Sequence, residues 1–323
     1  MDNKQIYSKT LGFSLRRVLW DVIALLILGA ACGIGFYAAE KASDKGLIGL
    51  LIGLVLGLII IAVLTRYISY SLKAGQIAMM TKGITEGSLP ENVIREGKAI
   101  VKERFLTVAA FFAVTNVIKG IFNQLGRRLT NLGGKLGGDT GRSIGSAISM
   151  AVSVLIAYLS DCCLGWVFYR KNVNAAKATC EGAVLFFKHG KTLLRNMGRI
   201  FGMGLASLII IGAPFAGLFY WIASHFGNAF QVLASEIGEA AARGELNIPE
   251  ALTDPRILMI AAAVIAAVII WSIIHSVFIR PFVLVGVLRN YVESGMQDVP
   301  AESDFRALDS VSPKFKKLHS GLA

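Results

Sequence analysis

The sequence predicts an all-α, polytopic integral membrane protein, and three observations lead to that fold class. Hydrophobic residues make up 54% of the 323 residues and charged residues only 17%, whereas a soluble domain carries about 25% charge. The mean hydropathy is +0.61. The apolar residues also gather in runs of roughly 20 residues, the length that an α-helix needs to cross the hydrocarbon core.

Six apolar runs predict about six transmembrane helices within a single transmembrane domain, residues 1–323. Only the segment EKASDKG separates the first two runs, so these are expected to form a tight hairpin, and later pairs complete three hairpins. The third run is the weakest because it contains Asn116 and Lys119. The predicted spans are residues 18–39, 47–65, 105–125, 144–169, 200–226 and 257–288.

The distribution of Lys and Arg predicts that both termini are cytoplasmic. With that orientation, 24 of the 33 Lys and Arg residues fall inside and 9 outside, as the positive-inside rule requires. Each hairpin is followed by a basic, amphipathic cytoplasmic segment: residues 66–104, 170–199 and 289–323. The net charge of +12 is therefore attributed to topology and to anionic lipid headgroups, with no specific nucleic-acid partner. A bacterial cytoplasmic membrane is the expected location.

One loop does not fit this orientation. Residues 125–146 are rich in glycine and carry four positive charges and one negative charge on the predicted outer side. Three explanations remain open. The third and fourth spans could form a re-entrant pair, the loop could line a polar cavity, or other segments could set the orientation.

Glycines recur at helical spacing in the first two spans. Gly49, Gly53 and Gly57 lie four residues apart, as do Gly29 and Gly33. Residues at this spacing share one face of a helix, and a face of glycines lets a second backbone approach closely in lipid. Packing within one chain and self-association into a homo-oligomer would both use such a face, and both interpretations remain open.

Polar residues within the predicted spans are candidates for a pathway through the membrane. A charged group in the bilayer is costly unless it is paired or hydrated. Asp161 and Arg280 both fall toward the cytoplasmic ends of their spans, so an ion pair between them is possible. Such a pair could belong to an ion or substrate pathway, or it could be structural. Asn116, Lys119 and His275 are the other candidates.

Two prolines predict kinks in the last two spans. Pro214 follows the run IIIGA, and Pro281 follows Arg280. Proline removes a backbone hydrogen bond and collides with the preceding turn of the helix. Either proline could therefore bend its span, or break it so that backbone groups face a substrate.

No pattern in the sequence points to catalysis. The four histidines are scattered, and the four cysteines lack the spacing of a zinc or redox motif. Neither a metalloprotease helix motif nor a serine-nucleophile elbow is present. The sequence therefore predicts no enzyme, no metal and no cofactor.

The C-terminal half resembles choline-transporter-like membrane proteins. The resemblance rests on residues 193–196 (LLRN), which precede two spans, and on the basic tail ending at residues 316–318 (KKL). It implies transport and carries over no substrate residue.

The sequence thus favours a transporter or channel-like protein, because it combines intramembrane polarity, repeated hairpins and kinked spans. The alternative is a non-catalytic scaffold or assembly subunit of a larger membrane complex, such as a secretion or conjugation machine. That alternative follows from the lack of a sharp substrate site and from the three amphipathic segments, which could dock partners.

Overall fold

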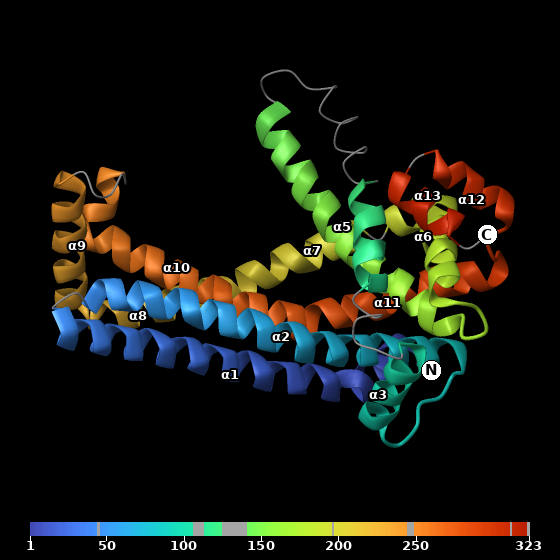
Figure 1. Cartoon of the computed structure of the whole chain (residues 1–323), viewed down its shortest axis with the longest axis horizontal. Coiled ribbons are helices and arrows are strands. Elements are labelled where there is room, and N and C mark those ends of the chain that lie inside the picture. Colours follow the sequence, from blue (N-terminus) through green and yellow to red (C-terminus); the bar gives the residue numbers. More distant parts are fainter. Residues whose placement is uncertain are drawn as a thin grey trace. The chain divides into compact units, whose positions relative to one another are not determined.

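All regular secondary structure in the described part of the protein is helical (Figure 1). The computed structural model describes residues 1–43, 46–105, 113–124, 141–195, 197–243, 249–310 and 312–321. Two compact units are present, one comprising Met1–Gly198 with Arg280–Ala323 and the other Arg199–Ile279. Three helical stretches among the described residues are long and apolar enough to cross a membrane: Asn3–Ala42, Gly202–His225 and Pro255–Gln297.

The first unit begins with a hairpin of two very long helices. α1 (Asn3–Ser43) has 41 residues and α2 (Gly46–Thr85) has 40, so each is about 60 Å long at 1.5 Å per residue. The hydrocarbon core of a bilayer is only about 30 Å thick. The apolar residues occupy the part of the hairpin next to the connection, so the start of α1 and the end of α2 extend well beyond one bilayer core.

Glycines hold this hairpin together at close range. A Cβ atom added to Gly49 of α2 would collide with the carbonyl oxygen of Gly35 of α1, and one added to Gly53 would collide with that of Ala31. One added to Gly57 would press against Leu28. The two backbones are therefore in direct contact, which side chains at these positions would prevent. Large apolar side chains cover the outer faces of both helices and are exposed.

The core of the first unit lies at the other end of the hairpin. The first part of α1 and the last part of α2 pack there with a bundle of helices. These are α3 (Val93–Arg104), a helix over residues 113–124, α5 (Gly141–Tyr169), α6 (Ala175–Arg195), α11 (Arg280–Gln297), α12 (Glu302–Asp309) and α13 (Pro313–Ser320). The largest fully buried side chains come from α1, α2, the helix over residues 113–124, α5, α11 and α13, and include Phe13, Met79, Phe122, Trp166, Tyr291 and Phe315.

Polar contacts bind these helices into one body. The buried carboxylate of Glu181 on α6 accepts hydrogen bonds from Trp166 Nε1 at 3.0 Å and from Arg170 Nε at 2.8 Å. Tyr291 of α11 donates its hydroxyl to the carbonyl of Gly182. Because each group is satisfied, the helices are fixed in position at little desolvation cost.

The second unit contains the remaining apolar helices. α8 (Ala213–Ser224) packs along α10 (Pro255–Ile274), and α9 (Gly227–Ala242) follows α8 and contacts α10 (Figure 1). Ala263 and Ala267 of α10 are buried. Small residues four apart let the helices approach closely, as in other membrane hairpins.

Both prolines at the predicted kinks are preceded by a π-helical turn. The segment η1 (Leu208–Gly212) follows α7 (Met197–Ser207) and ends just before Pro214, and η3 (His275–Ile279) ends just before Pro281. A π-turn widens the helix by one residue and so accommodates the missing amide and the bulky ring. At both sites helical backbone continues through the proline.

The predicted third and fourth spans are described only in part. Residues 106–112 and the basic loop residues 125–140 lie outside the described residues. In the described parts, Ile118, Ile121 and Phe122 are buried, as is the stretch from Tyr158 to Phe168. Their apolar side chains therefore contact other helices of the first unit.

Candidate functional site

A charged cluster centred on Asp161 is the most distinctive polar feature of the first unit. The carboxylate of Asp161 receives Lys73 Nζ on Oδ1 at 2.6 Å and Arg280 Nη2 on Oδ2 at 2.7 Å. The side chain of Asp161 is 7% exposed, whereas Lys73 and Arg280 are 27% and 26% exposed. The acid therefore lies at the bottom of the cluster, and the two cations connect it to the surface.

Three helices position these groups. Asp161 lies within the buried stretch of α5, and its carboxylate is therefore enclosed by the neighbouring helices. Lys73 belongs to the part of α2 beyond the apolar run. Arg280 is the first residue of α11, directly after the π-turn. Its guanidinium also donates to the carbonyl of Ala157 at 3.2 Å and lies 5.4 Å from the ring centre of Tyr158.

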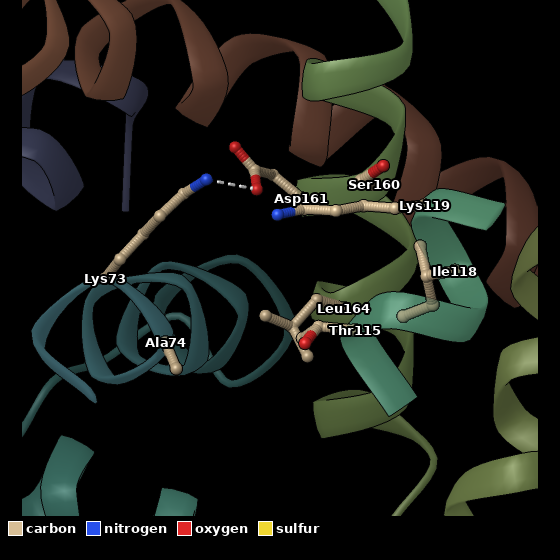
Figure 2. Close-up of a pocket in the computed structure, with 8 residues that line it drawn as sticks. All are labelled: Lys73, Ala74, Thr115, Ile118, Lys119, Ser160, Asp161 and Leu164. Carbon is tan, nitrogen blue, oxygen red and sulfur yellow. Dashed lines mark ion pairs between the residues drawn. The ribbon is translucent and has the colours of Figure 1, made fainter. Parts of the chain in front are cut away.

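A small cavity lies on one side of Asp161. It has a volume of ≈ 20 Å³, room for about one water molecule. Thr115 and Ser160 supply hydroxyls to its wall, and Figure 2 shows the amines of Lys73 and Lys119 directed toward Asp161 from different helices. A polar cavity of this size can hold a hydrogen-bonded water beside the carboxylate.

A larger cavity of ≈ 390 Å³ adjoins the cluster and shares Lys73, Lys119, Ser160 and Asp161 with the small one. Four cationic side chains line it, namely Arg17, Lys73, Lys119 and Arg280, and Asp161 is the acid among its lining residues. Neutral polar groups of Asn123, Ser153 and Ser160 and the apolar side chains of Ile156 and Ala157 complete the lining. The excess of positive charge makes this cavity attractive to an anion.

Arg17 adds a fourth helix to the arrangement. It lies within electrostatic range of Asp161 and Arg280, and Asp21 one turn further along α1 partly balances its charge. Its Nε atom is buried and has no hydrogen-bond partner among the described residues. A buried donor in this state is uncommon and marks a place where a ligand or water can bind.

The structure brings together three of the five polar residues singled out in the sequence and separates the other two. Asp161 and Arg280 are paired, and Lys119 lines both cavities. Asn116 is exposed on the helix over residues 113–124. His275 belongs to the second unit, where its ring lies 5.2 Å from that of Trp271.

The glycines also divide into two groups. Gly49, Gly53 and Gly57 contact α1 through the hairpin described above. Gly29 and Gly33 have no described atom within 4 Å of the position that a Cβ would take. The stripe on α2 therefore serves packing within the chain, while the stripe on α1 faces away from α2.

Two residues of the cluster, Lys73 and Arg17, were not singled out in the sequence. Both lie outside the predicted spans, Lys73 in the amphipathic segment 66–104 and Arg17 just before the first span. One signal was available for Lys73, because it interrupts a stretch that is otherwise free of charge from residue 67 to residue 81. Outside the cluster, Glu181, which is buried at 1% exposure, gave no such signal.

A second ionic cluster closes the C-terminal end of the first unit. His319 of α13 contacts Asp309 at 2.9 Å and Glu302 at 2.8 Å. The hydrogen bond to Asp309, followed by that to Glu302, raises the pKa of His319. Lys188 of α6 pairs with Asp298 and Asp304. These pairs tie α12 and α13 to each other and to α6.

Within the described ranges no group of three or more His, Cys, Asp or Glu side chains is arranged to hold a metal ion. No family model, curated protein or solved structure matches the chain. The resemblance to choline-transporter-like proteins therefore stays a prediction. Fold and site define the class: an all-helical protein with helices that can span a membrane and a buried, predominantly cationic cluster.

Proposed function

We propose that the chain is an integral membrane transporter or channel-like protein, and that the cluster around Asp161 is the cytoplasmic end of its pathway. One observation carries the proposal: a buried carboxylate is held by cations from two other helices next to a cavity of ≈ 390 Å³. Buried charges of this kind are costly to maintain. Charged residues inside membrane segments commonly mark ion or substrate pathways, and we place this cluster where such a pathway would open to the cytoplasm.

We further propose that the chain crosses the membrane four times, in place of the six crossings expected from the sequence. Exposed large apolar side chains of the first unit come almost entirely from residues 15–60 of the α1–α2 hairpin. Among the side chains described elsewhere in that unit, only Phe282, Met296 and Val299 are exposed in this way. In the second unit, exposed large apolar side chains are frequent between residues 205 and 269. Helices that face lipid need such surfaces.

The charge distribution supports four crossings more strongly than six. With four, residues 66–199 are cytoplasmic as a whole, including the basic glycine-rich loop that the six-span arrangement places outside. Only four of the 33 Lys and Arg residues are then external: Lys41, Lys45, Arg243 and Arg256. The remaining 29 are internal, which is a stronger positive-inside bias.

Labelling of single introduced cysteines distinguishes the two arrangements. Gly137→Cys lies in the basic loop, which is internal with four crossings and external with six. Ser235→Cys is external and Ser88→Cys internal in both, so these two variants calibrate the signal; both positions are exposed. Intact cells are treated with a membrane-impermeant maleimide, with the unmodified chain as background. Labelling of Gly137→Cys at the level of Ser235→Cys would exclude four crossings.

A scaffold or assembly subunit is the second candidate, and the packing within the hairpins favours it. The glycine-lined contact between α1 and α2 leaves no room for a polar path. The hollow between α8 and α10 is lined by Ala216, Tyr220, Ile260, Ala263 and Val264, none of them charged. A pathway would therefore have to form elsewhere, for example between subunits. The face of α1 that bears Gly29 and Gly33 is available for such self-association.

Purification and flux measurements separate the two candidates. The transporter proposal expects a clean homo-oligomer or monomer that releases trapped chloride or inorganic phosphate from liposomes, with Asp161→Asn changing the rate. Asp298→Asn, an exposed acid of the first unit, is the matched control. A stoichiometric partner after purification, together with no flux above that of empty liposomes, would favour the scaffold.

A further inference from the structure

We propose that the larger cavity beside Asp161 binds the phosphate of an anionic phospholipid headgroup in the inner leaflet. The inference rests on the proposed membrane topology and deepens it, because it assigns a ligand class to the charged cluster. It stands on the charge of the cavity, an unpartnered donor of Arg17, the position of Arg17 at the start of the first apolar run and the exposed apolar side chains of α1.

The charge of the cavity favours an anionic ligand with several acceptor oxygens. Arg17, Lys73, Lys119 and Arg280 line the cavity, and Asp161 compensates only part of their charge. Asp21 offsets part of the charge of Arg17. A net positive charge remains, and the single negative charge of a phosphodiester headgroup would neutralise part of it.

The donors in the cavity suit phosphate oxygens. Arg guanidinium groups bind phosphate through two parallel hydrogen bonds, and Lys adds a point charge. The buried Nε of Arg17 has no partner among the described residues. Ser160 adds a hydroxyl in the same wall. A phosphate in the cavity would lie beside the Arg17 side chain, where a small shift of that side chain would turn its unpartnered Nε toward a phosphate oxygen.

The position of the cavity along the helices matches the headgroup layer. Arg17 directly precedes the apolar run that begins at Val18. Lys73 follows the end of the second apolar run by eight residues, about 12 Å along α2. Headgroups occupy roughly the outer 5–8 Å on each side of the hydrocarbon core. By backbone position, Arg17 therefore lies at the level of the lipid phosphates, and Lys73 lies just beyond that layer.

Exposed apolar side chains of α1 can accompany the lipid chains. They begin with Leu15 and Leu19, which are 54% and 60% exposed and lie two residues to either side of Arg17, on the other face of the helix. A separate hollow of ≈ 460 Å³ combines Leu19, Trp20 and Ile68 with the cations Arg16 and Lys98. Tryptophan beside basic residues is typical of the membrane interface. A free phosphate ion would gain nothing from these surfaces, so a lipid is the better occupant.

The test measures bound lipid on the purified full chain by native mass spectrometry after reconstitution in nanodiscs. One set contains phosphatidylcholine with phosphatidylglycerol and the other phosphatidylcholine alone. We expect the wild type to retain phosphatidylglycerol through detergent extraction. The double variant Arg17→Gln/Lys119→Gln is expected to lose it by about tenfold or more, as expected for lost charged hydrogen bonds. Neither substitution removes a cation that directly pairs with Asp161 in the two ion pairs given above.

The matched control is Arg95→Gln/Lys102→Gln, which removes two exposed cations of α3 that line neither cavity. We expect it to retain phosphatidylglycerol within about twofold of the wild type, since surface charges contribute little. Equal loss in both double variants would overturn the proposal, because binding would then follow total charge.

Inorganic phosphate provides the arm that distinguishes the source of the ligand. If millimolar phosphate in detergent raises the Tm of the wild type as much as phosphatidylglycerol does, the site binds a free anion and the lipid assignment fails. Lipid binding is measured without flux and without cell labelling. Its failure is therefore distinguishable from failure of the proposed transport or topology, each of which has its own measurement.

Discussion

Nζ of Lys73 on α2 lies 2.6 Å from Oδ1 of Asp161 on α5, and Arg280 of α11 holds the other carboxylate oxygen at 2.7 Å. One carboxylate thus joins three helices that are far apart in the sequence. Because the carboxylate is 7% exposed, its charge depends on both partners. The cluster therefore links the stability of the first unit to the cavity that we propose as its binding site.

Removal of the carboxylate should destabilise the protein strongly. Asp161→Asn leaves two partly buried cations next to each other without their shared counter-charge, and we expect the free energy of unfolding to fall by about 3 kcal/mol. Equilibrium unfolding in detergent micelles, followed by tryptophan fluorescence, measures the change. Asp298→Asn, which breaks a pair that is 33% and 44% exposed, should cost less than about 1 kcal/mol.

A double-mutant cycle then tests whether Lys73 and Asp161 act together. In the variant Lys73→Gln/Asp161→Asn neither charge of the pair remains, so the combined loss should be smaller than the sum of the two single losses by about 1 kcal/mol or more. Strictly additive losses would mean that the 2.6 Å contact contributes no coupling in solution.

The glycines of the hairpin should respond unequally to the same substitution. Gly53→Ala places a methyl group against the backbone of Ala31, which cannot move aside, so we expect a loss of about 1–3 kcal/mol. Gly33→Ala meets nothing within 4 Å and should leave stability unchanged or raise it by up to about 1 kcal/mol, because alanine favours the helix. Unfolding in detergent compares the two, and similar effects would contradict the packing described.

The C-terminal helices should loosen as the pH rises above neutrality. Hydrogen bonds to Asp309 and Glu302 raise the pKa of His319 above its ordinary value of 6.5. The stabilisation is therefore complete below pH 6.5 and is lost as the pH rises through the pKa of the folded state. Hydrogen exchange in residues 302–321, corrected for the intrinsic pH dependence, should show more opening at pH 8 than at pH 6.

His319→Gln is the variant that isolates this effect. It should exchange at a corrected rate that no longer depends on pH in that range, while His225→Gln in the second unit leaves the difference intact. A wild type without any pH difference would show that the two acids do not hold the protonated histidine.

The thiol of Cys180 should be almost inert in the folded protein. Burial raises its pKa to about 12, so very little thiolate is present near neutral pH, and the side chain has no exposed surface. We expect modification by N-ethylmaleimide at least about a hundredfold slower than at an introduced Ser88→Cys. Peptide mapping after timed labelling measures both rates. Equal rates in the folded and the SDS-unfolded protein would contradict the burial.

Much of the helical architecture could be predicted from local patterns. The apolar runs around residues 18–39 and 47–65 predicted α1 and α2, but they gave only the lipid-facing part of each helix. The polar flanks of these helices have no apolar stripe of membrane length, so their continuation to residues 3 and 85 depends on packing in the core of the first unit. The spacing of Gly49, Gly53 and Gly57 predicted a packing face on α2. It did not predict which helix packs there, because a glycine face in lipid allows close approach of any helix backbone.

The sequence by itself determined the helical class, the net positive charge and the presence of an acid at position 161 within an apolar run. Composition and spacing along the chain are sufficient for those properties. Only the tertiary structure decided which cations neutralise that acid. Lys73, Asp161 and Arg280 meet because three separate helices converge on one core. Contacts of this kind depend on the relative placement of whole helices, and no local pattern records that placement.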